Sequence, residues 1–302
     1  MRTSAAASRG AQVEVDLRRR LPAFALCLLL AAVGLIETWA HLVNGGPGWD
    51  AWAYWDAWRG PMYDGSVGDP GHFLYSPAFA QVVWPLAQTT WPVFLAVFIA
   101  INAVGLAWLL RPMPAILAVP LWLAASQEIV SGNIFIPMAI VAVLGMRHPH
   151  LWAFVALTKV TPALGPVWFA VRGEWSAVVK ATVTTLAVAA VSYVVAPGLW
   201  HQWFTFLLDQ ARLTDGAIGY EFIPGPLYRI PVALALVVWA ARTDRVWVLP
   251  VAMVVATPFI WNGSLTLLAA VPRLTAARRR SAEGATDSPT APGATAGSRT
   301  AS

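Results

Sequence analysis

Asp50 is the side chain of this sequence with the clearest potential for chemistry. It lies in residues 49–58, where tryptophan recurs at every third position, just after the first long apolar segment. A carboxylate among so many indole rings is costly to bury unless it is hydrated, paired or functional. An ionised aspartate can take a proton from a hydroxyl group as a general base. Asp50 is therefore the first candidate catalytic residue.

The tryptophans around Asp50 also fit a simpler interpretation. A spacing of three residues gives a stripe on one side of a helix, as in an aromatic belt at a membrane surface. Such a belt does not require Asp50 or Asp56. Asp56 follows six residues after Asp50, so the two carboxylates lie on different faces of a regular helix. We therefore expect a single base rather than a carboxylate pair.

Two cations are candidates for binding an anionic phosphate. Lys159 stands between two short apolar segments, where a lysine is costly unless it reaches the membrane surface or meets an anion. Arg229 stands near the start of a later apolar segment and could serve similarly, although a lone arginine there is more often an anchor.

Two further segments resemble helix starts that could also contribute to a site. In Tyr75-Ser76-Pro77, Ser76 fits an N-cap and Pro77 the first helical position. Gly132-Asn133 opens another apolar segment, and the N-terminus of a helix can bind an anion.

Soluble cofactor chemistry has no support in this sequence. The histidines His41, His72 and His201 lack the spacing of a metal cage, although a carboxylate could hold a divalent metal. The chain has no phosphate-cradling glycine loop, and its single cysteine excludes an intrachain disulfide. No cofactor is therefore expected, and an activated donor would have to come through the membrane.

The composition identifies the elements that must position these residues as membrane helices. Among 302 residues, 58% are hydrophobic and only 12% charged, and the mean hydropathy is +0.61. These values are typical of an all-α polytopic membrane protein. The net charge of +5 comes from basic residues at the chain ends and in short turns, which indicates orientation in a bilayer rather than nucleic-acid binding.

Apolar runs predict about ten transmembrane or re-entrant helices. They cover residues 21–43, 92–110, 113–125, 133–146, 151–159, 162–171, 177–196, 227–241, 246–261 and 264–274. A short apolar helix is expected at 77–86, and outer loops at 44–75 and 197–226. The division is a cytoplasmic tail (1–20), a polytopic membrane domain (21–275) and a disordered cytoplasmic tail (276–302).

The lysine and arginine distribution predicts the orientation of these helices. With both termini in the cytoplasm, most of the 20 basic residues fall on the inner side. Asp50, Asp56 and Glu128 then lie on the extracytoplasmic side of the plasma membrane. Polar chemistry is therefore expected at the outer face.

These motifs, in this order, resemble glycosyltransferase family 87 of actinobacterial membrane proteins. After the first helix the family has an Asp, a Tyr four residues on, an Ala three further, a Gly and a Leu-Tyr-like pair. The matching residues are Asp50, Tyr54, Ala57, Gly60 and Met62-Tyr63. The later motifs are represented by Phe73 to Pro77, Pro85-Leu86, Gly132-Asn133, Lys159 to Pro162, Arg172 to Trp175 and Pro258 to Trp261.

The resemblance implies a GT-C type fold and a polyprenyl-phosphate sugar donor. Family members transfer mannose, and some transfer arabinofuranose, to envelope glycolipids or glycans. By the resemblance, Asp50 aligns with the catalytic aspartate, and Lys159, with Arg229, would bind the donor phosphate. Contacts to the sugar or the acceptor are expected from Trp52, Tyr54, Trp55, Tyr75 and Asn133.

A second hypothesis is a protein that catalyses no transfer. It could be a degenerate glycosyltransferase, a carrier of lipid-linked sugars or a scaffold for envelope assembly. A transporter should show repeated halves and charges near the membrane midplane, and the sequence shows neither clearly. Donor binding without transfer would identify the degenerate enzyme.

Overall fold

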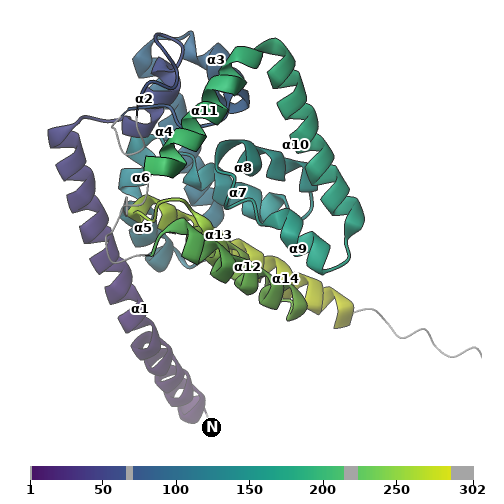
Figure 1. Ribbon diagram of the computed structural model, residues 1–302. Coiled ribbons are helices and arrows are strands. Elements are labelled where there is room, and N and C mark those ends of the chain that lie inside the picture. Colours follow the sequence, from purple (N-terminus) through teal and green to yellow (C-terminus); the bar gives the residue numbers. More distant parts are fainter. Residues whose placement is uncertain (1, 66–70, 214–223, 287–302) are drawn as a thin grey trace, which may run out of the picture.

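The computed structural model describes residues 2–65, 71–213 and 224–286, with side chains at 21–65, 71–209 and 224–278. These residues form helices and connecting segments, with no strand among them (Figure 1). The first half comprises α1 (Arg2–Asn44), α2 (Trp49–Asp56), α3 (Pro77–Ala87), α4 (Trp91–Leu110), α5 (Ala115–Ala124), α6 (Ser126–Ser131) and α7 (Phe135–Leu144). The second half comprises η1 (Pro149–Leu151), α8 (Trp152–Thr158), α9 (Gly165–Val171), α10 (Trp175–Val195), α11 (Pro197–Leu213), α12 (Pro226–Arg242), η2 (Val246–Val248), α13 (Leu249–Ala256), η3 (Asn262–Ala270) and α14 (Val271–Thr286).

Three helices in the described residues are long and apolar enough to cross a membrane. They are Leu21–Asn44 of α1, Trp91–Leu110 and Trp175–Val195. The remaining apolar helices are shorter than the roughly 20 residues that a bilayer requires. The structure therefore shows a helical membrane protein but does not confirm about ten spanning helices.

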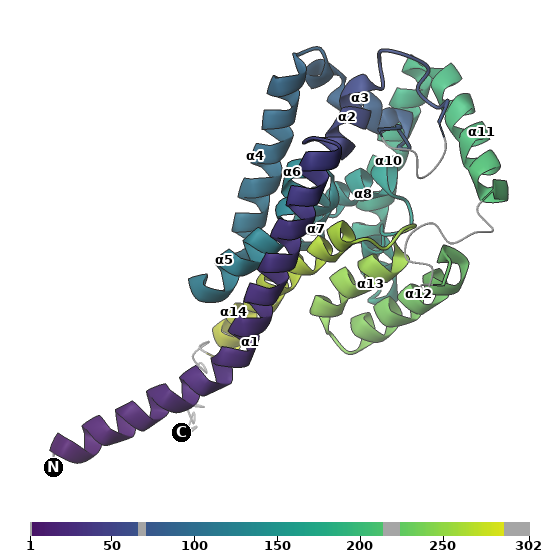
Figure 2. The same ribbon diagram turned by 90° about the vertical axis from the view of Figure 1, so that its left-hand side faces the viewer.

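The helix α1 runs along one side of the molecule against α5 and α6 (Figure 2). Small residues permit this close approach, because a Cβ atom at Gly34 would collide with the backbone of Ala124. The hydroxyl groups of Thr38 and Ser126 also lie 2.7 Å apart across the same interface. These contacts attach the first membrane span to the segment that precedes α7.

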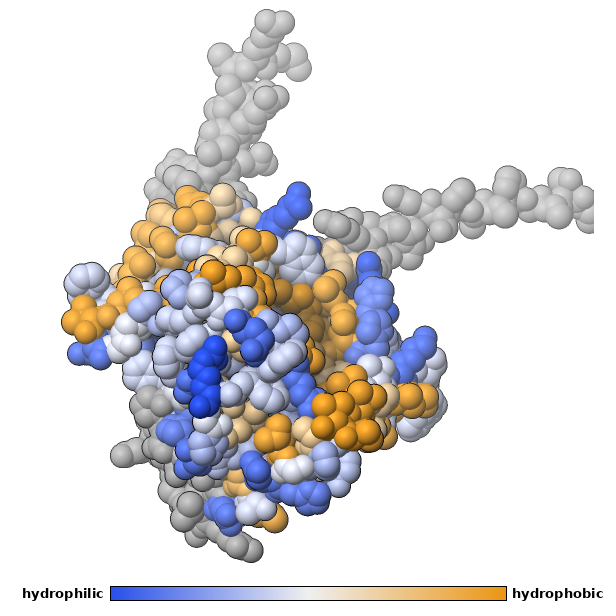
Figure 3. Space-filling view, turned by 90° about the horizontal axis from the view of Figure 1, so that it is seen from above, coloured by the Kyte–Doolittle hydropathy of each residue, from blue (hydrophilic) through white to orange (hydrophobic). Residues whose placement is uncertain are grey.

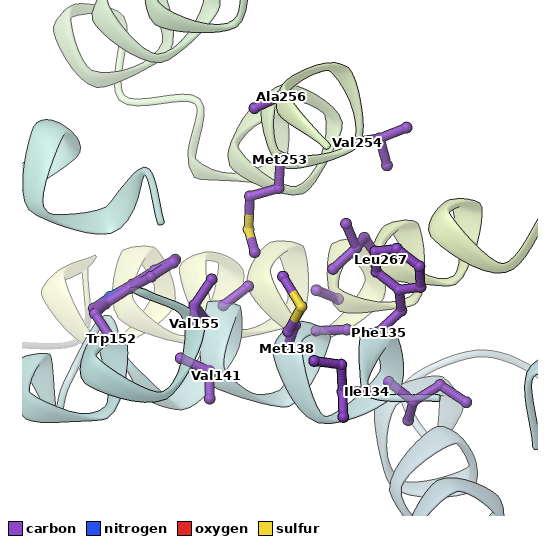
Figure 4. Packing of buried hydrophobic residues seen from close by; sticks show 14 of the residues in the cluster. Ile134, Phe135, Met138, Val141, Trp152, Val155, Met253, Val254, Ala256 and Leu267 are labelled. Carbon is purple, nitrogen blue, oxygen red and sulfur yellow. The ribbon is translucent and has the colours of Figure 1, made fainter. Parts of the chain in front are cut away.

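The centre of the molecule is the packing of α7 against η3, α8 and α13. Phe135 and Met138 of α7 lie beside Met253 of α13 and Leu267 of η3 (Figure 4). All four side chains are almost completely buried. This apolar core lies directly beneath the polar residues described below.

The largest difference from the predicted elements is α11, which occupies the first part of the loop expected at 197–226. Trp200, Trp203 and Phe206 recur at helical spacing and are buried together, packing against Tyr63 and other residues. The residues between them are exposed and include the polar side chains of His201, Gln202 and Thr205. Polar residues therefore alternate with the buried aromatic ones along this amphipathic helix. A search for continuous apolar runs does not detect such a helix.

The ends of the chain also differ from the predicted tails. The helix α1 begins at Arg2, where alanine favours continuation of the apolar helix toward the N-terminus. The helix α14 continues to Thr286, beyond the boundary expected at residue 275. The rest of the predicted C-terminal tail, 287–302, lies outside the described residues.

Candidate active site

Asp50 lies in the first turn of α2, which packs directly on the end of α6. The backbone N–H of Gly48 donates a hydrogen bond to the carbonyl oxygen of Val130 at 3.0 Å. Gly132 ends α6 with a φ of +72°, and a Cβ atom there would lie 2.6 Å from the Cβ of Ala51. A side chain at residue 132 would therefore both strain the backbone and separate the two elements.

The carboxylate of Asp50 is stabilised by two polar neighbours from the end of α6. Hydrogen bonds with the side chains of Ser131 and Asn133 favour its ionised form. The Oδ1 atom of Asn133 accepts the Ile134 backbone N–H at 2.7 Å, which leaves its amide hydrogens for Asp50. Asn102 of α4 in turn donates to the Asn133 carbonyl oxygen at 2.9 Å. A membrane-spanning helix thus holds the loop that binds Asp50.

Glu128 is a second carboxylate beside Asp50, and the sequence did not identify it as a site residue. Its side chain is only 4% exposed. The Oε1 atom accepts the backbone N–H of Phe135 at 3.3 Å. A Cβ atom at Gly263 would collide with the Oε2 atom, so the glycine makes room for the carboxylate. The available sequence signal is an acid between apolar segments, four residues before Gly132.

Lys159 follows α8 and enters the same buried region. Its Nζ atom lies 3.5 Å from the centroid of the Phe135 ring and 5.9 Å from that of Tyr75. The ring faces stabilise the ammonium group by cation–π attraction. Lys159 therefore points inward onto the apolar core rather than outward to a membrane surface.

Asp50, Glu128 and Lys159 form one electrostatic unit, which we call the buried cluster. Burial raises the pKa of Asp50, and the charge of Lys159 opposes this rise. Burial and the nearby Asp50 charge also raise the pKa of Glu128. Burial lowers the pKa of Lys159, whereas both carboxylates favour its charged form. With all three ionised, two negative charges and one positive charge leave a net charge of −1.

Tyr54 and Tyr75 form an aromatic wall of the buried cluster. Their hydroxyl oxygens lie 3.2 Å apart, within hydrogen-bonding distance. Tyr54 is completely buried between Tyr75, Phe79 and Phe98. The structure therefore places both tyrosines near Asp50, with Tyr75 also close to Lys159.

Trp52 and Trp55 lie on a different face of α2 from Asp50. The ring centroids of Trp52 and Trp91 are 5.0 Å apart, and the Trp55 Nε1–H donates to the Thr89 carbonyl oxygen at 2.9 Å. Both indoles therefore join α2 to the start of α4. The structure does not bring these two predicted contacts together with Asp50.

Arg229 lies apart from the buried cluster and is 8% exposed. Its guanidinium group donates to the carbonyl oxygens of Pro224, Val255, Thr257 and Pro258 at 2.6–2.9 Å. These bonds hold the end of α13 and use four of its five N–H donors. Because these donors are already bound to backbone carbonyl oxygens, the structure gives no support to the expectation that Arg229 binds the donor phosphate.

A small pocket opens beside the buried cluster and could admit a hydroxyl group. His41, Trp49, Gln127 and Ser131 contribute to its lining. Ser131 also contacts Asp50, so one side chain is shared by the pocket and the candidate base. In the described part of the chain, no group of three or more His, Cys, Asp or Glu residues could hold a metal ion.

The surface at the α2 and α3 end gathers polar side chains in its middle, with apolar patches at several places around them (Figure 3). Together with the apolar helices and the buried cluster, this arrangement defines a membrane protein with a polar centre. The sequence model of glycosyltransferase family 87 matches residues 73–281. The chain belongs to this family and is thus a membrane glycosyltransferase by family.

The matched residues include Glu128, Asn133, Lys159 and Arg229 but begin downstream of Asp50. The family match therefore carries no information about the role of Asp50. A comparison with curated proteins and another with solved structures each found no significant match.

Proposed function

We propose that this protein transfers mannose from a polyprenyl-phosphate donor to a glycolipid or glycan acceptor of the cell envelope. The observation that carries the proposal is the buried cluster within a chain of glycosyltransferase family 87. It combines a carboxylate suited to accept a proton with an ammonium group suited to bind a phosphate. Transfer takes place at the outer face of the plasma membrane, with both termini in the cytoplasm.

Asp50 is the general base of the proposed reaction. Its carboxylate accepts the proton of the acceptor hydroxyl as that oxygen forms a bond to the anomeric carbon of the sugar. The bond between this carbon and the phosphate oxygen breaks, and polyprenyl phosphate leaves with the electron pair. Because the leaving group is already a stabilised anion, no strong general acid is required. A single displacement inverts the anomeric centre, so a β-linked donor gives an α-linked product.

Lys159 is the cation for the donor phosphate. Its position over Phe135, close to Tyr75, fixes the ammonium group before the donor binds. A preorganised positive charge stabilises negative charge that develops on the leaving phosphate. Tyr75 and Asn133 are the proposed contacts to the sugar or the acceptor, because they lie beside Lys159 and Asp50.

The decisive experiment compares Asp50→Asn with Asp56→Asn in membranes supplied with radiolabelled polyprenyl-phosphate mannose and envelope lipid acceptors. Both carboxylates belong to α2, and each substitution removes one charge from the same helix. Loss of a positioned base reduces transfer by about 10²–10⁴-fold, so Asp50→Asn should lose nearly all product. Asp56→Asn should retain transfer.

Unchanged transfer by Asp50→Asn would exclude Asp50 as the base. If the unmodified protein binds the donor without forming product, the protein is a degenerate enzyme or a carrier of lipid-linked sugars. Arabinofuranose transfer is resolved by supplying the corresponding polyprenyl-phosphate donor in the same assay.

A further inference from the structure

We propose that Glu128 is the proton-holding carboxyl group of the buried cluster, so that donor binding is coupled to the uptake of one proton. This inference rests on the proposed function, because it concerns the binding of a phosphodiester donor. It assigns a role to a residue that is not the general base and does not bind the phosphate directly. Glu128 is thus a positioning residue that sets the charge of the site.

The surroundings of the two carboxylates differ in a way that selects Glu128 as the protonated one. Asp50 is only partly buried and has two side-chain hydrogen-bond partners, Ser131 and Asn133. Glu128 is 4% exposed, and the hydrogen bond to its carboxylate comes from the backbone of Phe135 at a long 3.3 Å. Fewer donors and less solvent stabilise an ionised carboxylate less, so a shared proton resides on Glu128.

Charge counting gives the reason for proton uptake. A sugar phosphodiester carries one negative charge, and the fully ionised cluster already carries a net charge of −1. Their sum of −2 would face a single ammonium group in a region where water is scarce. When Glu128 is protonated, the negative charge of Asp50 and the positive charge of Lys159 cancel, so the incoming donor meets a neutral site.

The other groups that face this pair are less suited to take up the proton. His41 of α1 acts on Asp50, whereas Tyr54 and Tyr75 act on both carboxylates from the aromatic wall. The phenols already carry their protons near neutral pH and cannot take up another, and the Lys159 ammonium group already holds the proton with which it binds the donor. The elevated pKa of Glu128, caused first by burial and then by the Asp50 charge, supports the same choice.

The experiment measures proton uptake by the full chain, purified in detergent, when it binds polyprenyl-phosphate mannose. Calorimetry in two buffers of different ionisation enthalpy gives the number of protons taken up. The phosphodiester itself does not titrate near neutrality, so any uptake comes from the protein. Above the pKa of Glu128, we expect an uptake approaching one proton and an affinity that falls about tenfold per pH unit.

The variant Glu128→Gln tests the assignment because an amide cannot accept the proton. We expect the proton uptake to be smaller than that of the unmodified protein at the same pH, and any remaining uptake to belong to Lys159, whose pKa burial lowers to about 8. The matched control is Glu174→Gln, because Glu174 is a partly exposed carboxylate that pairs with Arg172 in the turn before α10. This control should take up the same number of protons as the unmodified protein.

Two results would overturn the inference and leave the proposed function intact. One is donor binding by the unmodified protein without proton uptake, which requires no variant and is therefore independent of folding defects. The other is undiminished uptake by Glu128→Gln, which would assign the proton to Asp50 or Lys159. Absence of any donor binding would instead refute the proposed function, and the inference with it.

Discussion

Two groups of charged side chains in this molecule show opposite arrangements. The buried cluster unites two carboxylates and one ammonium group with little solvent. The second group, which we call the turn network, comprises Arg172, Glu174, Asp244 and Arg278. Its three ion pairs measure 2.7, 3.0 and 3.0 Å, and its side chains are 34–57% exposed. It joins the turn before α10 to the turn after α12 and to α14.

This difference in burial and charge balance distinguishes ion pairs that join structural elements from charged groups suited to catalysis. The turn network balances two positive charges with two negative ones, and solvent screens what remains. The buried cluster carries an unbalanced charge when all three of its groups are ionised, and burial of that charge opposes folding. Groups with perturbed pKa values that are retained at such a cost are typical of functional sites.

The largest predicted effect comes from removing the cation of the buried cluster. Lys159→Met should reduce transfer by about 10²–10³-fold, because one preorganised charge at the leaving phosphate is lost. Initial rates at varied donor concentration check this prediction. Arg172→Met removes a cation of the turn network and should leave these rates unchanged. Comparable losses in both variants would contradict the division of roles.

Substitution of two glycines with the same φ angle compares the packing beside the buried cluster with that beside the turn network. Gly132 and Gly173 both have a φ of +72°, but only Gly132 has an element packed against the position of a Cβ atom. Gly173→Ala should cost about 1–2 kcal/mol through backbone strain alone. Gly132→Ala adds overpacking against Ala51, for a total loss of about 2–4 kcal/mol.

Denaturant unfolding of both glycine variants in the same detergent measures this difference. Equal losses would show that α2 shifts freely away from the end of α6. Such freedom would weaken the argument that this packing fixes Asp50.

The pH dependence of transfer tests whether the buried Asp50 differs from an exposed carboxylate, through the loss of transfer at low pH. Asp50 must be ionised to act as a base, and its pKa is raised by burial. Transfer should therefore fall as the pH drops through this raised pKa, about tenfold per pH unit, above the range of an exposed aspartate. Asn133→Ala removes a hydrogen bond to the ionised form and should move the fall to higher pH. Asn44→Ala, which removes an exposed amide bonded to the Ala40 carbonyl, should not move it.

The smallest effect is expected in the turn network. Asp244→Asn removes the acceptor charge shared by Arg172 and Arg278, and asparagine tolerates the positive φ of 54°. The loss of stability should be about 0–1 kcal/mol, with unchanged transfer. Thermal unfolding in low and high salt checks this value, because salt should reduce the difference. A loss above this range would show that the network does more than join exposed turns.

Part of the fold could be predicted from the sequence because continuous apolar runs are local signals. The runs at 92–110 and 177–196 predicted α4 (Trp91–Leu110) and α10 (Trp175–Val195) within two residues at each end. Ser76 and Pro77 likewise marked the start of α3. The segment α11 was missed because its apolar residues recur at helical spacing between polar ones.

The candidate site was only partly accessible to the same reasoning. Asp50 and Lys159 stood out because charge is costly beside apolar segments, and the structure brings them into one cluster. Arg229 also stood out as a charge beside an apolar segment. Its guanidinium group, however, donates hydrogen bonds to the backbone carbonyl oxygens of Val255 and Thr257, which are distant in the sequence. Trp52 and Trp55 were predicted as ligand contacts, but their orientation depends on α4.

By itself, the sequence determined the helical membrane class and the residues whose charge required an explanation. Both follow from side-chain chemistry and short-range periodicity, which act within a few residues of each position. Only the tertiary structure placed Glu128 beside Asp50 and Lys159, with Gly263 making room for it. These residues come from α2, α6, η3 and the end of α8, so their meeting depends on how those elements pack rather than on any local pattern.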